Sequence, residues 1–270
     1  MGYLKVLAKL QLEEDLLQVA RCFSEHQLLI NPKKTKYLLI GTRQLLQNLP
    51  SDMNLSFMGE TISPISAAKD LGVMMDTHLT YDRHTTDLAS SCMAKLMQIN
   101  RVKKCFDKET LSLLVSALVM NKLLYCSTIW SNTSTKNINK LQSVQNFACR
   151  IVTNTRKFEH ITPKLRELNW LPVKQQLLFK ESVMMYKCIH DLAPPYLCNK
   201  FKIRSNIHEC NTRNRGLLQI PLFNTTSGQR TFLYRGVKLW NNLDDEIKLV
   251  PSLTIFKKEL MKFMLNNFYC

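Results

Sequence analysis

The sequence predicts a mostly helical protein with a small β portion, of the α+β class. Apolar residues recur at the three- and four-residue spacing of helices after residue 80, whereas short alternating runs, typical of strands, precede it. The 270-residue chain has only seven Gly and nine Pro, too few for a collagen-like or low-complexity architecture. With 45% hydrophobic and 21% charged residues, it can bury a core rather than stay disordered.

The amino-terminal part combines one helix with short strands. Apolar residues share one helix face at Leu12, Leu16, Val19 and Phe23. Asn31-Pro32 breaks this pattern, and the apolar run 37–40 before Gly41 predicts a short buried strand. Further strands are expected at 55–58, 61–62 and 70–75. These elements predict a small helix-plus-sheet unit.

Three helices are expected between residues 80 and 158. The first carries an apolar stripe from Leu88 to Ile99, and Asp107 is expected to cap the second. The third follows Ser134 and leaves polar residues available to solvent or phosphate, namely Lys140, Gln142 and Arg150. Three successive helices predict a bundle.

Helices are also expected throughout the carboxy-terminal part. Thr162-Pro163 predicts a helix start, because proline is favoured in the first turn. The expected helices are 163–170, 173–190, 195–201, a segment around 232–240 and one from 252 onward. A polar, exposed loop is predicted at 203–228. The chain is therefore expected to form three domains, at 1–78, 79–158 and 159–270.

The charge distribution favours a polyanionic partner. A formal net charge of +16 favours nucleic acid first and an anionic membrane second. The charge is concentrated in two stretches without Asp or Glu, which we call the first (110–158) and second (210–243) acid-free stretches. The candidate phosphate-binding residues of the first stretch are Lys122, Lys136, Lys140, Arg150, Arg156 and Lys157. The second stretch carries Arg213, Arg215, Arg230, Arg235 and Lys238. Any one of these residues is more often part of a solvated surface, so the prediction rests on the two stretches together.

Cysteine usage and hydropathy predict an intracellular protein, either cytoplasmic or nuclear. Nine cysteines without a Cys-x-x-Cys pair favour reduced thiols. Lysines and glutamates interrupt the amino-terminal apolar pattern, so we expect no signal peptide there. Asn121 and Lys122 interrupt the most apolar window, 111–130, which therefore predicts a core helix and no membrane span.

Common catalytic and metal-binding motifs are missing from the sequence. It has no Gly-x-Ser-x-Gly element and no Gly-x-x-x-x-Gly-Lys-Ser/Thr loop. Cys188-x-His190 and His208-x-Cys210 could supply zinc ligands, but their spacing is unlike that of zinc fingers, so core cysteines are favoured. The adjacent acids Asp244-Asp245 favour a helix start over a magnesium site. We therefore expect no cofactor and no bound metal.

An ordered series of motifs resembles the carboxy-terminal part of reverse transcriptases of non-LTR, LINE-type, jockey-like retrotransposons. The segment 31–41 resembles their last palm element, 70–73 the hairpin that joins palm to thumb, and 140–146 the signature thumb helix. Further matches are 160–163, 170–173, 186–187, 192–197, 238–241 and 252–258. The resemblance covers nearly the whole chain from about Leu12. It implies truncated palm hairpins, a helical thumb-like bundle and a helical carboxy-terminal region.

The resemblance also implies a function. Enzymes of this family copy RNA into DNA, and aspartates upstream of the matched segment hold their two magnesium ions. We therefore expect this chain to lack catalytic residues and polymerase activity, with Mg²⁺ required only in a full-length polymerase. Lys34 matches a palm lysine proposed to protonate pyrophosphate and is read as vestigial. Leu71, Gly72 and Val73 match the primer-gripping hairpin, which touches the nucleic-acid backbone.

The predicted function is binding of an RNA/DNA or DNA duplex backbone without sequence readout, and no membrane partner is expected. Two alternatives remain open. The chain could be part of an active reverse transcriptase that another chain completes, or a non-functional remnant of a mobile element. The sequence predicts no oligomeric state.

Overall fold

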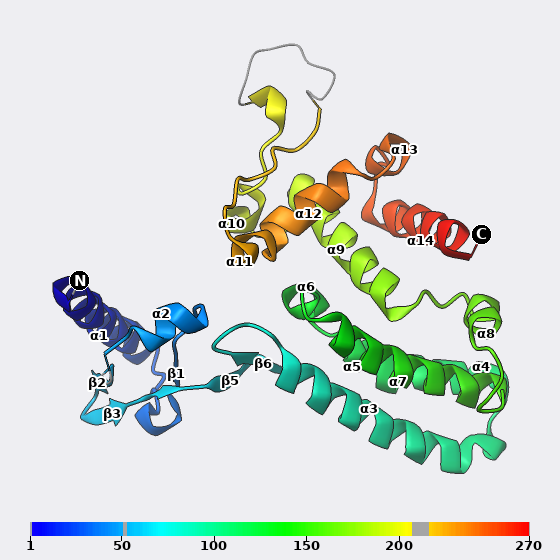
Figure 1. The fold of residues 1–270 in the computed structure, drawn as a ribbon, viewed down its shortest axis with the longest axis horizontal. Helices are drawn as coiled ribbons and strands as arrows, with labels where there is room; N and C mark the ends of the chain where they lie inside the picture. Colours follow the sequence, from blue (N-terminus) through cyan, green and yellow to red (C-terminus); the bar gives the residue numbers. More distant parts are fainter. Residues whose placement is uncertain (1, 51–52, 207–215, 270) are drawn as a thin grey trace. The chain divides into compact units, whose positions relative to one another are not determined.

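The computed structural model describes residues 2–50, 53–206 and 216–269. The chain divides into two compact units, residues 1–84 and 85–270. Helices dominate, and the sheets have two strands each (Figure 1). The predicted fold class, mostly α with a small β portion, is confirmed.

The first unit contains one long helix and three small sheets. Helix α1 (Gly2–Glu25) begins well before the predicted stripe at Leu12. Strand β1 (Tyr37–Leu38) pairs in parallel with β4 (Pro64–Ile65). Strands β2 (Leu55–Phe57) and β3 (Glu60–Ile62) pair antiparallel, as do β5 (Ala67–Asp70) and β6 (Val73–Asp76). The short helices η1 (Pro32–Lys34) and α2 (Arg43–Gln47) complete the unit.

The core of this unit is small. Leu55, Phe57 and Ile62 are buried, and Leu16 and Tyr37 are among the residues that pack against them. The predicted strand at 37–40 is present only at Tyr37–Leu38, and its predicted burial is wrong, because Tyr37 is half-buried and Ile40 is 54% exposed. The reason is that β1 is two residues long and has a single partner strand among the described residues.

The alternating pattern predicted one strand at 70–75, which is wrong, whereas the hairpin that the resemblance implied at 70–73 is present. Asp70 pairs with Val73 across the β5–β6 hairpin, so Leu71 and Gly72 form a two-residue turn. Their φ angles of 42° and 93° are the left-handed values that match the twist of such hairpins. The alternating apolar pattern of the sequence runs through the turn and conceals it.

The second unit begins with a group of successive helices. They are α3 (Asp82–Val102), α4 (Lys108–Val115), the π-helical turn η3 (Ser116–Met120), α5 (Asn121–Leu123), α6 (Ser127–Trp130) and α7 (Thr135–Thr153). The predicted cap Asp107 is confirmed, and Ser134, after which the third helix was expected, also caps its helix. The Asp107 carboxylate accepts a hydrogen bond from Thr110 N–H at 2.7 Å, and the Ser134 hydroxyl accepts one from Asn137 N–H at 3.4 Å.

Helices also build the rest of the second unit. They are α8 (Thr162–Glu167), α9 (Val173–Ile189), α10 (Pro195–Cys198), η4 (Arg204–Asn206), α11 (Thr226–Gln229), α12 (Phe232–Asn241), α13 (Asp245–Lys248) and α14 (Leu253–Tyr269). The helix start at Asp244-Asp245 is confirmed. Helices α9, α12 and α14 share an apolar core, in which Tyr186 stacks on Phe256 with ring centroids 4.4 Å apart.

The predicted exposed loop 203–228 is partly wrong. Ile203 and Leu218 form a β-bridge, and Leu218 is only 3% exposed. Its backbone N–H donates to the Asn241 side chain at 3.0 Å, which anchors the segment on α12. Residues 207–215 lie outside the described part of the chain.

Two glutamines attach α7 to the start of α9. The Gln142 side chain accepts a hydrogen bond from Val173 N–H at 2.8 Å, so its predicted availability to solvent is wrong. Gln145 is fully buried and donates to the Leu171 carbonyl at 2.8 Å. The Gln142 bond satisfies the Val173 N–H in the first turn of α9, which helix geometry leaves unpaired. The Gln145 bond gives the Leu171 carbonyl, just before this helix, a buried partner. The exposed face of α7 is therefore the opposite one.

Candidate nucleic-acid interface

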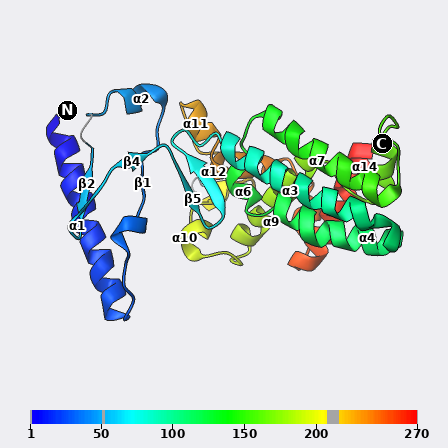
Figure 2. The same cartoon turned by 90° about the horizontal axis from the view of Figure 1, so that it is seen from below.

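Helices α3 and α7 run side by side in the same direction (Figure 1, Figure 2). Two lysines join them at opposite ends. The Lys140 ammonium donates to the Thr86 hydroxyl at 2.9 Å near both helix starts. The Lys103 ammonium donates to the Asn154 side-chain oxygen at 3.1 Å just beyond both helix ends. These contacts define an elongated surface with positive charge at each end.

One face of α7 supplies most of this surface. Lys136, Lys140, Ser143, Phe147 and Arg150 follow each other at spacings of three and four residues, which places them on a single helix face. Lys136 is exposed, whereas Lys140 and Arg150 are half-buried. About 15 Å of helix separates Lys140 from Arg150, at 1.5 Å per residue. The structure thus brings three of the six predicted cationic residues into one row.

A hollow of about 480 Å³ opens at the carboxy-terminal ends of α3 and α7. It is lined by Asn100, Lys103, Ser143, Asn146, Phe147, Arg150, Ile151, Thr155 and Lys157. We call this set the cationic hollow. Three of these residues are cationic, and among the described residues that line it none is acidic. An anion placed here meets positive charge and neutral hydrogen-bonding groups, without a nearby carboxylate in the lining.

Lys103 was missed by the sequence analysis. It lies outside the first acid-free stretch, in the short helix η2 (Lys103–Cys105) after α3. A usable signal was present: residues 88–106 also lack Asp and Glu, and they carry the doublet Lys103-Lys104 near their end. The intervening acids Asp107 and Glu109 concealed the continuity of the two segments.

Arg150 serves the fold as well as the hollow. Its guanidinium donates to the carbonyl of Arg156 at 3.3 Å and to that of Glu159 at 3.0 Å. These bonds hold the loop that follows α7, in which Arg156 and Lys157 are exposed. Arg150 therefore positions other cationic residues in addition to adding its own charge.

Lys122 lies apart from the α7 row. It is exposed on α5 and donates to the Ser91 hydroxyl of α3 at 2.5 Å. Lys122 and Lys140 thus both contact serine or threonine hydroxyls of α3. Asp82 and Asp87 occupy the first two turns of the same helix, so the positive potential is expected to be stronger near the cationic hollow than at this end.

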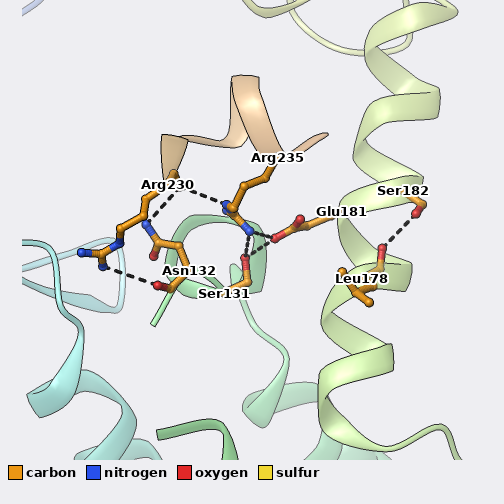
Figure 3. A network of polar contacts seen from close by, with 7 residues as sticks. All are labelled: Ser131, Asn132, Leu178, Glu181, Ser182, Arg230 and Arg235. Carbon is orange, nitrogen blue, oxygen red and sulfur yellow. Dashed lines mark hydrogen bonds and ion pairs between the residues drawn. The ribbon is translucent and has the colours of Figure 1, made fainter. Parts of the chain in front are cut away.

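The second acid-free stretch is used inside the protein. Figure 3 shows Arg235 of α12 paired with Glu181 of α9, whose carboxylate also accepts a hydrogen bond from the Ser131 hydroxyl. Arg230 donates from its guanidinium to the Asn132 carbonyl at 3.4 Å. Lys238 lies 4.7 Å from the centre of the Tyr234 ring. Arg213 and Arg215 lie outside the described residues.

The hairpin tip of the first unit presents Leu71, which is 84% exposed. Gly72 is also exposed, whereas Val73 is buried and leaves the tip. The predicted trio therefore divides into an accessible turn and a buried anchor. Lys34 ends the turn η1 and is exposed as well.

The carboxylate of Asp76 is occupied by neighbouring donors. It accepts hydrogen bonds from the backbone N–H groups of His78, Thr80 and Tyr81 at 3.0, 3.0 and 2.7 Å. Burial acts to raise the pKa of Asp76, but these hydrogen bonds outweigh it and hold the pKa below its ordinary value. Asp76 therefore organises the entry to α3 and does not fit the role of a magnesium ligand.

The other candidate ligands are also engaged in packing. Burial raises the pKa of the Cys188 thiol to about 11, and the His190 ring stacks on Tyr186 with centroids 4.0 Å apart. Within residues 2–50, 53–206 and 216–269, no three His, Cys, Asp or Glu side chains gather in a way that could hold a metal ion. No helix in the described part of the chain has the length and apolarity needed to cross a membrane.

Comparisons with known proteins identify two relatives in Drosophila melanogaster. The chain is 27% identical over 172 residues, 62% of its length, to "Probable RNA-directed DNA polymerase from transposon BS". It is 28% identical over 116 residues, 42% of its length, to "Probable RNA-directed DNA polymerase from transposon X-element". The matches cover 18% and 13% of these proteins, so the chain spans less than a fifth of either relative. No family model and no solved structure matches the chain. The predicted resemblance to retrotransposon reverse transcriptases is confirmed.

Proposed function

We propose that this chain is part of a retrotransposon reverse transcriptase and that its second unit binds the phosphate backbone of nucleic acid. The cationic hollow is the observation that carries the proposal, because Lys103, Arg150 and Lys157 converge there from three segments. The similarity to two RNA-directed DNA polymerases of transposons supports nucleic acid as the polyanion. In the same reading, residues 1–78 are a partial palm, 79–158 a thumb and 159–270 a downstream helical region.

The chemistry of the surface favours contact with phosphates over reading of bases. Lysine ammonium groups attract phosphate as point charges, and their binding releases condensed counterions whatever the base sequence. The two ends of the α3–α7 surface, at Thr86 and Lys103, are about 25 Å apart along α3 at 1.5 Å per residue. That length corresponds to about seven steps of a duplex at 3.4 Å per step. An RNA/DNA or DNA duplex is the proposed ligand.

The β5–β6 hairpin is proposed as a second contact, in the first unit. Leu71 at φ 42° and Gly72 at φ 93° form a tight tip with an exposed apolar side chain. A non-glycine residue held at positive φ is uncommon outside Asn and Asp. The contact proposed for this tip is with the nucleic-acid backbone, as for the primer-gripping hairpin that it resembles. Lys34 is proposed as a vestigial residue without a catalytic role.

Binding without DNA synthesis is the proposed activity of this chain by itself. Primer extension by the purified 270-residue chain, with Mg²⁺ or Mn²⁺ and all four deoxynucleotides, tests this directly. We expect no extended product. Extension above a no-protein control would refute the proposal and show that the chain supplies its own metal ligands.

The salt dependence of binding tests the interface. In the variant Lys103→Gln/Lys140→Gln/Lys157→Gln, each lost phosphate contact should lower the slope of log K against log salt by about 0.9. We therefore expect the slope to fall by up to about 2.7. Arg150 is left unchanged because it holds the loop after α7.

A matched control removes the same charge elsewhere in the second unit. Lys257, Lys258 and Lys262 are exposed on α14, which packs on α9. Changing all three to Gln should leave most of the slope intact. Equal effects of the two triple variants would show that only net charge matters and would reject the α3–α7 interface.

A further inference from the structure

The loop after α7 presents one aromatic ring to solvent. Phe158 is 93% exposed, although a phenylalanine ring is among the side chains that gain most from burial. Its neighbours in the chain are the exposed cations Arg156 and Lys157. The Lys157 ammonium lies 5.7 Å from the centre of the Phe158 ring. An exposed ring beside two cations has no role in the core of this protein.

The loop that carries the ring is fixed before any ligand binds. Asn154 ends α7 in the left-handed conformation, with φ 51°. Thr155 N–H then donates to the Arg150 carbonyl at 3.2 Å, and the Arg150 guanidinium donates to two carbonyls further along the loop. The Glu159 carboxylate, the next acid along the chain, accepts from Arg156 N–H at 3.1 Å. A preorganised ring binds its partner without the entropy loss of ordering a mobile loop.

The ring also adjoins the cationic hollow. Lys157 belongs to the hollow lining and approaches the Phe158 ring, so both features share one residue. Positively charged grooves that hold the backbone, combined with aromatic side chains on which bases stack, are typical of proteins that bind single-stranded nucleic acid. In an intact duplex the bases already stack on one another. Away from the duplex ends, therefore, only an unpaired base can lie flat on Phe158.

We propose that Phe158 is a stacking platform for an unpaired base of a strand whose phosphates lie in the cationic hollow. The ligand class is a single strand, or the single-stranded extension of a duplex. This inference rests on the proposed backbone binding and adds a preference that phosphate contacts alone cannot produce. A protein partner that uses Phe158 as an apolar anchor would show no such dependence on unpaired bases.

Fluorescence anisotropy of the full chain tests the proposal with three labelled DNA probes. These are a 15-nucleotide single strand, a blunt 15-base-pair duplex, and the same duplex with a three-nucleotide extension. Base stacking on an aromatic side chain contributes about 1–3 kcal/mol. Phe158→Ala should therefore weaken binding of the single strand and the extended duplex by about 5- to 150-fold. The blunt duplex should change less than about twofold.

Two control variants separate stacking from other effects. Phe158→Tyr keeps an aromatic face and should bind the single strand within about twofold of the original chain. Leu222→Ala removes another large exposed side chain, 94% exposed, and should change no affinity. Phe158→Ala should also leave the salt slope unchanged, because it removes no charge.

The outcomes distinguish the stacking platform from the proposed backbone binding on which it rests. If no probe binds the unaltered chain, backbone binding fails and the stacking platform fails with it. If binding is salt-dependent but Phe158→Ala leaves the single strand unaffected, only the stacking platform is refuted. Equal weakening of the single strand and the blunt duplex would also refute it, since the ring would then not discriminate unpaired bases.

Discussion

The buried ion pair between α9 and α12 gives the sharpest stability prediction. The Glu181 side chain is 3% exposed and that of Arg235 is 23% exposed. In the variant Arg235→Met the carboxylate stays buried and keeps the Ser131 hydroxyl as a partner, but it loses its opposite charge. Figure 3 shows that Arg235 also joins this cluster to the Arg230 carbonyl, at 2.9 Å.

The size of the effect follows from this burial. Breaking a buried ion pair by removal of one partner destabilises a protein by about 3–5 kcal/mol, because an uncompensated charge remains. For a domain of 150–250 residues, 1 kcal/mol corresponds to about 2–4 °C in Tm. Arg235→Met should therefore lower the Tm by roughly 6–20 °C. Circular dichroism at 222 nm during heating measures this shift, since the second unit is mostly helical.

Two further variants make the test specific. The double variant Glu181→Met/Arg235→Met removes both charges and should recover part of the loss, since apolar replacement of a whole buried pair is often nearly neutral. Lys164→Met breaks a pair with Glu167 whose side chains are 38% and 41% exposed, and should lower stability by less than about 1 kcal/mol. A loss for Arg235→Met as small as that for Lys164→Met, or strict additivity in the double variant, would refute the reasoning.

Three other predictions concern single sites. Because the pKa of Asp76 is lowered in the fold, its stabilisation is present above the ordinary carboxyl pKa and lost as pH falls through the lower folded value. Asp76→Asn should therefore destabilise the chain at pH 7 and flatten its acid unfolding, as measured by urea titrations at several pH values. Burial raises the pKa of the Cys149 and Cys188 thiols to about 11, so both should resist alkylation at pH 8 until urea unfolds the chain. The exposed thiols of α1 and η2 should react at once. Mass spectrometry of the alkylated peptides measures this difference. Leu71→Asn should raise the unfolding midpoint slightly, because Asn tolerates the left-handed φ that Leu71 adopts before Gly72; a lower midpoint would contradict the turn geometry.

Helix positions could be predicted where apolar spacing and caps agreed. Asp107 caps α4 as predicted, and Ser134 caps α7 where the sequence placed the start of a helix, because a side-chain oxygen before an amphipathic stretch satisfies a free N–H group. The resemblance placed a hairpin at 70–73, where β5 and β6 meet. The apolar alternation alone missed its turn, because Leu71 is an unusual residue for a left-handed turn and its apolar character continued the strand pattern. The burial of Leu218 could not be predicted from the sequence either, because it depends on a β-bridge to Ile203 and on a hydrogen bond to the Asn241 side chain of α12.

The candidate interface was predictable in composition but not in geometry. The absence of acids between 110 and 158 identified six cationic residues, and the α7 spacing already placed three of them on one helix face. The parallel packing of α3 against α7 adds Lys103, which no local pattern connects to Lys157. The exposure of the Phe158 ring could not be predicted from the sequence, because the exposure of a single phenylalanine depends on the tertiary structure.

The arginines and lysines of the acid-free stretches have different uses. Arg150 and Arg230 direct their guanidinium groups to backbone carbonyls, and Arg235 pairs with a glutamate from another helix. A guanidinium carries several donors in a fixed plane and can therefore join segments without a local carboxylate. Exposed positive charge in these regions comes mainly from lysines such as Lys136 and Lys157. A run without Asp or Glu therefore contains two kinds of cation: arginines that join segments inside the fold and lysines that are exposed on the surface. It follows that substitution of these lysines should change the salt dependence of binding, whereas substitution of Arg150, Arg230 or Arg235 should act first on the stability of the fold.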